Sequence, residues 1–139
     1  MRRIVTGVDA SGRSCVVEET TFPDPADAPV MDVIHQTPTS PPPTRPAGIG
    51  EDLDLGVPPG IARWILVQGL PGVEAPMHHT DTIDFDTIIS GSVELILHDG
   101  PHRLEPGDCV VVTGVDHGWK AGPDGWTASV VLIGTAPPQ

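Results

Sequence analysis

From residue 61 onward, short apolar runs recur at intervals of roughly ten residues, with glycine, proline or aspartate between them. Runs this short are typical of β-strands, because an amphipathic helix needs a longer segment with an apolar residue at every third or fourth position. No segment of the sequence shows that helical period. The pattern therefore predicts a β-sandwich or β-barrel, with strands at residues 61–68, 83–89, 93–98, 103–105, 108–113, 118–120 and 127–133.

Composition points to the same fold class. Glycine and proline together account for 33 of the 139 residues, and both residue types interrupt helices. The chain has no tyrosine, two phenylalanines and three tryptophans, so its core must consist mostly of valine, isoleucine, leucine and alanine. Turns are expected at residues 98–101 and 104–108, where glycine and proline favour sharp corners. The length suits one domain with a real core, and we expect a single all-β domain.

The first 60 residues are expected to form a hairpin followed by an arm. Two β-prone runs, residues 3–8 and 14–19, flank a turn-rich tetrapeptide, which is a hairpin signal. The segment from Phe22 to Pro59 contains ten prolines, so this arm should be extended and irregular, apart from an isolated strand that could form at residues 30–34. We expect residues 1–60 to belong to the same domain as a barrel at residues 61–139, or to contact a dimer partner. The arm is either a surface wrap or a segment that crosses that partner or covers a pocket.

The net charge of −12 argues against two classes of partner. The 19 acidic residues are spread through both halves of the chain, and the 7 basic residues are scattered. Binding to nucleic acid or to an anionic membrane needs clustered lysine and arginine, so neither is expected. No secretory signal or long apolar segment is visible. Cys15 and Cys109 form no Cys-x-x-Cys pair and are expected to be reduced thiols, which predicts a cytoplasmic protein.

Histidine is concentrated in the second half of the chain, where five of the six histidines lie. The adjacent pair His78 and His79 precedes an expected strand with Asp84 near its start, and His117 follows a later strand. Inward-pointing side chains of neighbouring strands converge in a small barrel, so a histidine of the pair, the acid and His117 could meet at one metal ion. Imidazole and carboxylate ligands suit Fe(II), Mn, Ni, Zn or Cu. The two histidines beside the expected turn at residues 98–101 should be exposed, and these are His98 and His102.

Two stretches of the sequence resemble the two motifs of the cupin family. Residues 72–91 contain a glycine, two histidines, an acid and a second glycine in the order of the first motif. Residues 107–117 begin with Gly-Asp and end with Gly-x-x-His, as in the second motif. The resemblance covers residues 61–133. It implies an antiparallel β-barrel of the jelly-roll type and a homodimer, in which the N-terminal strands and the proline-rich arm contact the partner subunit.

The first motif departs from the family pattern at the histidine pair. The family has one residue between the two histidines, whereas His78 and His79 are adjacent. The two positions therefore fall either on Met77 and His79 or on His78 and Thr80. Strand alternation places residues 78, 80 and 84 on one face, which favours His78. The acid, Asp84, is one methylene shorter than the usual glutamate, and outside a site it would order a turn or pair with an arginine, Arg63.

The resemblance implies an enzyme that acts on a small organic molecule in the barrel pocket. A divalent transition metal (Fe, Mn, Ni, Zn or Cu) would serve as Lewis acid or bind dioxygen, and oxidative cleavage, decarboxylation and lyase-type reactions all occur in such families, with dioxygenase or lyase chemistry favoured. Asp84 and His117 are the candidate catalytic residues. The candidate metal ligands are His78, His79, Asp84 and His117. The candidate pocket residues are Trp64, Thr80 and Trp119.

Two other functions stay open at this point. The first is a non-catalytic cupin that binds a small ligand or acts as a sensory module, in which the imperfect motif is a lost metal site and no metal is bound. The second is a metal-independent isomerase or cyclase that uses Asp84 and a histidine as an acid–base pair. Metal analysis of the purified protein, together with ligand binding in the presence and absence of chelator, separates the metal-dependent enzyme from the non-catalytic cupin. The pH dependence of turnover by metal-stripped protein tests the metal-independent enzyme.

Overall fold

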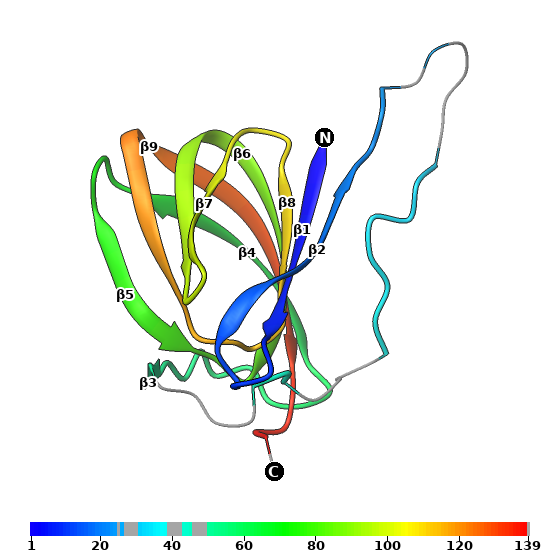
Figure 1. Ribbon diagram of the computed structural model, residues 1–139, viewed down its shortest axis with the longest axis vertical. Coiled ribbons are helices and arrows are strands. Elements are labelled where there is room, and N and C mark those ends of the chain that lie inside the picture. Colours follow the sequence, from blue (N-terminus) through cyan, green and yellow to red (C-terminus); the bar gives the residue numbers. More distant parts are fainter. Residues whose placement is uncertain (25, 27–30, 39–42, 46–49, 139) are drawn as a thin grey trace.

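The computed structural model describes residues 1–24, 26, 31–38, 43–45 and 50–138. All helix or strand structure within these residues is β-strand, which confirms the all-β prediction. The strands form one sheet that curls around an interior, as in a jelly-roll barrel (Figure 1). No helix that could span a membrane occurs in the described part of the chain.

The order of the strands in the sheet differs from their order in the chain. Along the sheet the strands follow the order β2-β1-β8-β6-β9-β5-β3, with β4 also paired to β9 and β7 to β6. The pairs β1–β8 and β3–β5 are parallel, and the other pairs are antiparallel. The strands are β1 (Arg2–Val8), β2 (Ser14–Thr21), β3 (Glu51–Asp52), β4 (Ala62–Gly69), β5 (Glu74–His79), β6 (Thr82–Leu97), β7 (Gly100–Leu104), β8 (Cys109–Val112) and β9 (His117–Gly134).

The strands β6 and β9 are longer than the sequence predicts, because each joins two of the expected strands. In β6 the expected break lies at Gly91, which forms no turn but sits inside the strand, where the pairing with β9 shifts. Gly91 has a φ of 72°, and a Cβ atom at this position would lie 2.0 Å from the carbonyl oxygen of Gly125. Glycine is therefore required for the two strands to approach, and it lets β6 bend without ending.

The sequence pattern does not predict β5. This strand places His78 and His79 at its end, whereas both were expected to precede a strand. Pro76 lies within β5, and the pairing with β9 is irregular between Ala75 and His78. Proline and irregular pairing are tolerated in such a strand. They remove the regular alternation of apolar and polar residues from which a strand is predicted.

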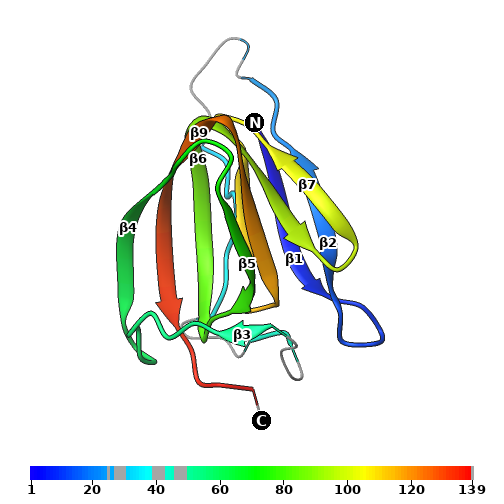
Figure 2. The same cartoon turned by 90° about the vertical axis from the view of Figure 1, so that its left-hand side faces the viewer.

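The N-terminal hairpin is confirmed, and the arm is irregular where it is described. In the hairpin turn, the Asp9 carboxylate accepts backbone hydrogen bonds from Ser11 and Arg13. After β2, only β3 has strand structure among the described residues of the arm. The strand expected at residues 30–34 is not found: residues 31–34 are irregular, and residue 30 lies outside the described residues. β3 runs across the end of the barrel at which β5 ends (Figure 2).

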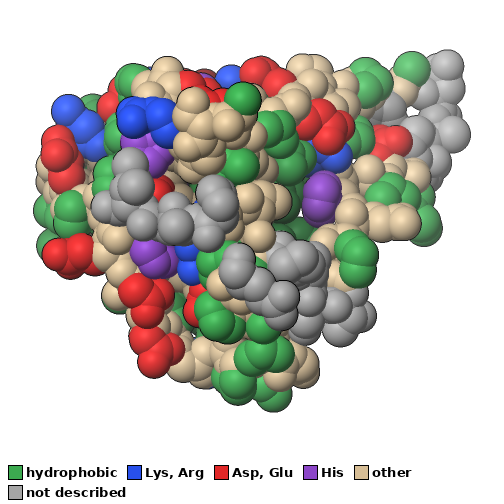
Figure 3. Space-filling view, turned by 60° about the horizontal axis from the view of Figure 1, so that its bottom comes forward, with side chains coloured by type: hydrophobic (Ala, Val, Ile, Leu, Met, Phe, Trp, Pro, Cys, Tyr) green, Lys and Arg blue, Asp and Glu red, His purple; other side chains and the backbone are tan. Residues whose placement is uncertain are grey.

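Aliphatic side chains fill most of the interior of the sheet. They come from alternate positions of β6, β7, β8 and β9, since successive side chains of a strand point to opposite faces. Among the least exposed are Ile88, Leu95, Leu104, Val110 and Val112. Charged side chains lie mainly outside. On the face shown in Figure 3 the acidic side chains are dispersed and the basic ones form no broad patch.

Candidate functional site

A pocket with a volume of about 300 Å³ opens in the interior of the barrel. Its walls come from β4, β5, β6 and β9, and the arm adds Leu53 and Leu55. Most of the wall is apolar, and among the described residues that line it there is neither lysine nor arginine. The polar and ionisable lining residues are His78, Thr80, Asp84, Asp86 and His117.

Two histidine rings lie next to each other on one side of this pocket. His78 ends β5 and His117 begins β9, and the two residues are direct neighbours in the strand pairing. Their ring centroids are 4.4 Å apart. The Nδ1 atom of His78 lies 2.9 Å from the Pro76 carbonyl oxygen, and that of His117 lies 2.8 Å from the Val115 carbonyl oxygen. Because a carbonyl only accepts, Nδ1 is the donor in both rings, and Nε2 of each neutral ring is free to accept a proton.

His117 is neutral at physiological pH. The side chain is buried, and burial lowers its pKa to about 4, with a further lowering from the neighbouring rings of His78 and His79. Val115 and Asp116 act in the opposite direction and are outweighed. The unprotonated Nε2 is therefore present over the whole neutral range.

Two acids lie on the face of β6 that lines the pocket. Asp84 and Asp86 are separated by one residue, so both side chains point inward, and both are buried. The Thr82 hydroxyl donates to Oδ1 of Asp84 over 2.6 Å, whereas Oδ1 of Asp86 is buried with no hydrogen-bond partner among the described residues. Burial raises the pKa of Asp84 to about 7 against the lowering effect of Thr82. Burial and the charge of Asp84 hold the pKa of Asp86 well above its usual range.

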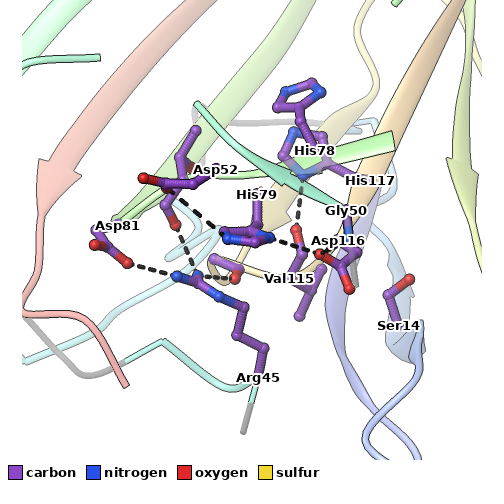
Figure 4. A network of polar contacts seen from close by, with 12 residues as sticks. Ser14, Arg45, Gly50, Asp52, His78, His79, Asp81, Val115, Asp116 and His117 are labelled. Carbon is purple, nitrogen blue, oxygen red and sulfur yellow. Dashed lines mark hydrogen bonds and ion pairs between the residues drawn. The ribbon is translucent and has the colours of Figure 1, made fainter. Parts of the chain in front are cut away.

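The second histidine of the adjacent pair faces away from the pocket. His79 Nδ1 lies 2.8 Å from Oδ1 of Asp116, and its Nε2 lies 3.9 Å from Oδ1 of Asp52 on the arm (Figure 4). Asp116 also accepts a hydrogen bond from the backbone N–H of Gly50 over 3.1 Å. Of the two histidines only His78 reaches the pocket, on the face that strand alternation favours.

A buried arginine from the arm completes this second polar cluster. Arg45 donates to the Thr80 carbonyl oxygen over 2.9 Å, to the Gly114 carbonyl oxygen, and to Asp81 over 2.5 Å. It therefore ties the arm to the chain segments next to both pocket histidines. We name this cluster the arm junction, and it consists of Arg45, Gly50, Asp52, His79, Asp81 and Asp116.

Comparison with known proteins identifies the family. No family model matches the chain. The chain is 33% identical over 134 residues to the phomopsin biosynthesis cluster protein C′ of Diaporthe leptostromiformis. The matched region covers 85% of this chain and 69% of that protein. It is 34% identical over 55 residues to a cupin-domain-containing oxidoreductase of Aspergillus ruber. Here the matched region covers 39% of this chain and 27% of that protein. The chain belongs to the cupin superfamily. A solved cupin domain, that of Schizosaccharomyces pombe Cnp3, is similar with a TM-score of 0.49 and 15% identity, over 54% of each chain.

The donor set of this cupin does not fit the predicted metal ion. Within the described residues, no group of three or more histidine, cysteine, aspartate or glutamate side chains could hold one. Catalytic metal sites normally use three protein ligands, whereas His78 and His117 lie together without a third such donor in the described part of the chain. Thr80 occupies the position of the second histidine of the cupin motif, and of the other predicted ligands His79 is bound to Asp116 and Asp84 to Thr82.

The tryptophans of this cupin divide between the pocket and the outer surface. Trp119 lines the pocket as predicted, and its ring stacks on that of Trp126 with a centroid distance of 5.3 Å. Trp64 does not line the pocket: it is 78% exposed, and its Nε1–H donates to the Ser129 hydroxyl on the outer face. The prediction for Trp64 is corrected because the odd-numbered residues of β4, such as Ile65, face the interior.

Several other predicted roles change in the structure. Arg63 donates to the Leu55 and Gly56 carbonyl oxygens and not to Asp84. His98 and His102 lie outside the pocket, as expected, but they are half-buried and not exposed, because Ser14 and Asp99 bind their rings.

Two site residues were missed, Asp86 and Trp126. Asp86 could have been found, because strand alternation places it on the face of Asp84. Trp126 carried no such signal, since the sequence does not show that β9 continues through Gly125.

Proposed function

We propose that this cupin is an enzyme that moves a proton within a small organic molecule, as in an isomerisation or a cyclisation. The observation that carries the proposal is the pairing of opposed acid–base groups around one apolar pocket. A buried imidazole with a lowered pKa and a buried carboxyl with a raised pKa line the same space. When the environments of two titratable groups shift their pKa values in opposite directions, one group can act as the base and the other as the acid.

His117 is the base in this scheme. Its Nε2 is unprotonated at neutral pH, and the hydrogen bond from Nδ1 to the Val115 carbonyl fixes the ring. His78 lies beside it with the same hydrogen-bond arrangement, so a proton taken up by either ring remains next to the substrate.

Asp84 is the acid. Its pKa of about 7 keeps a large share of the carboxyl protonated near neutral pH. Thr82 donates to Oδ1, which leaves Oδ2 to hold the proton that is delivered to the substrate. A proton leaves one atom of the substrate for His117, and another reaches a second atom from Asp84, so the net reaction needs neither oxidant nor reductant. The cycle closes when His117 releases its proton to solvent and Asp84 takes one up from it.

The relatives support an enzyme of small-molecule metabolism. Two similar proteins of Diaporthe leptostromiformis are named for a biosynthesis cluster, and two others are named cupin-domain-containing oxidoreductases. The metal-dependent enzyme implied by the motifs is the alternative. It is favoured by the two free Nε2 atoms and opposed by the absence of a third donor among the described residues.

Solvent deuterium exchange tests the proposal without a known substrate. Chelator-treated protein is incubated in D₂O with a panel of small ketones, enols and phenols, and deuterium on carbon is read by NMR. We expect exchange into at least one compound, with loss of that exchange in His117→Gln. Exchange that appears only after a transition metal is added back would overturn the proposal in favour of the metal-dependent enzyme.

A further inference from the structure

The charges around the pocket restrict what it can bind. The ionisable residues that line it are two histidines and two aspartates, and the described lining contains no lysine or arginine. The arm carries Arg45, but this arginine donates to two carbonyl oxygens and to Asp81 in the arm junction. A carboxylate or phosphate in the pocket would lose its hydration and meet two buried carboxyl groups, and the described lining offers it no lysine or arginine.

Asp86 has a polar atom that the protein leaves without a partner. The residue is only 4% exposed, and its Oδ1 has no hydrogen bond within the described chain. The Thr82 hydroxyl, on the same strand, donates to Asp84. A buried acceptor without a donor is costly, and Asp86 lines the pocket, so a donor on a bound molecule would satisfy it.

The rest of the wall suits a flat apolar skeleton. The rings of Trp119 and Trp126 both line the pocket and stack on each other with an interplanar angle of 27°. Leucine, isoleucine and valine side chains from the arm, β4 and β9 form the other walls. A volume of about 300 Å³ accommodates one or two fused rings with a small substituent.

We propose that the pocket selects an uncharged aromatic or similarly flat molecule that carries a hydroxyl group, and that Asp86 accepts a hydrogen bond from this hydroxyl. The inference rests on the proposed function, because it names the substrate class of the same pocket. Asp86 then determines specificity: it is the hydrogen-bonding end of a binding site whose other contacts are apolar.

Four compounds with one naphthalene skeleton test the selection. They are 2-naphthalenemethanol, 2-methylnaphthalene, 2-naphthoate and the ammonium form of 2-naphthalenemethylamine, and their binding is followed by tryptophan fluorescence at pH 6. We expect the alcohol to bind the wild-type protein roughly tenfold more tightly than either 2-methylnaphthalene or 2-naphthoate. Tightest binding of the carboxylate or of the ammonium compound would overturn the assignment of an uncharged ligand.

Substitutions at Asp86 test the assigned residue. In Asp86→Leu the alcohol should lose its advantage over 2-methylnaphthalene, whereas Asp86→Asn, which keeps an acceptor, should retain it within about threefold. Thr87→Ser, on the outer face of the same strand, is the matched control and should bind all four compounds as the wild type does. An unchanged advantage of the alcohol in Asp86→Leu would overturn the role of Asp86. If that variant does not fold, Asp86→Ala is measured in the same way.

The two proposals fail in different experiments. Absence of deuterium exchange in the wild-type protein contradicts the proposed function, whereas the order of the dissociation constants contradicts the inference about Asp86. Binding is also measured in His117→Gln, which should keep the preference for the alcohol although its exchange is lost. A loss of that preference in His117→Gln would assign the hydroxyl to His117 and overturn the inference.

Discussion

The pocket and the arm junction lie on opposite sides of the end of β5, and two adjacent histidines separate them. His78 lines the pocket, where the described residues offer the buried acids no lysine or arginine. His79 lies in the arm junction, where its ring contacts Asp116 and where Arg45 pairs with Asp81. Charges that are neutralised by a neighbour hold parts of a fold together, whereas buried ionisable groups without such a neighbour are typical of functional sites. Neighbouring residues of the same type thus have different roles because a strand directs them to different sides.

The largest expected effect is on the pocket side. His117→Gln should reduce turnover by a factor of roughly 10² to 10⁴, because glutamine accepts a hydrogen bond but cannot take up a proton. The measurement is the deuterium-exchange rate with the best compound of the panel. The matched variant on the other side is His79→Gln, for which we expect exchange within about threefold of the wild type. Equal losses in both variants would erase the distinction between the two regions.

The next effect is on the junction side and concerns stability. Arg45→Met should lower the free energy of unfolding by about 2–4 kcal/mol, because it leaves two backbone carbonyl groups without their donor and removes the partner of Asp81. Urea unfolding followed by tryptophan fluorescence measures the change. Arg103→Met is the control: the ion pair of Arg103 with Glu105 is exposed and should contribute less than about 1 kcal/mol. Similar values for the two variants would show that the arm is not anchored by Arg45.

The pH dependence of exchange sharpens the assignment of base and acid. His117 must be unprotonated, so activity should fall as the pH drops below about 4. Asp84 must be protonated, so activity should also fall as the pH rises above about 7. A bell-shaped profile between these limits is expected for chelator-treated protein. Activity that continues to rise above pH 7 would mean that Asp84 acts as the base.

The smallest expected effect is the pH-dependent stability of an Asp84 variant. The pKa of Asp84 is raised in the folded protein, so its contribution to stability is present at low pH and is lost as the pH rises through about 7. Asparagine carries no charge to bury. The melting temperature of Asp84→Asn should therefore exceed that of the wild type by a few degrees at pH 8, with a smaller difference at pH 5.

The control for this experiment is Asp124→Asn, since Asp124 is exposed. It removes the same charge from the protein without removing a buried carboxyl group. A gain at pH 8 of the same size in both variants would attribute the effect to net charge and not to the burial of Asp84.

The sequence predicts much of the sheet and part of the site, and the reason differs from residue to residue. The choice of His78 over His79 follows from alternation alone, because polar residues on the same face fix the register. The same rule extended by two residues would have predicted Asp86. Alternation fails for Trp64, since the residues on both faces of β4 are apolar and nothing in the strand itself says which face is buried. The role of Arg45 depends on contacts with residues far along the chain, which no local pattern encodes.

One feature of the sheet bears on how the chain is made. β9 is the last of the described strands, and it pairs with β4, β5 and β6, the three other strands that line the pocket. Within the described residues β4 pairs with β9 alone. Synthesis proceeds from the N-terminus, so β4 and β5 leave the ribosome before their partner β9, which is translated about fifty residues later. Until then the edges that pair with β9 are unpaired. The nascent chain therefore presents exposed strand edges during this interval, when it depends most on its own acidic surface or on a chaperone to avoid aggregation.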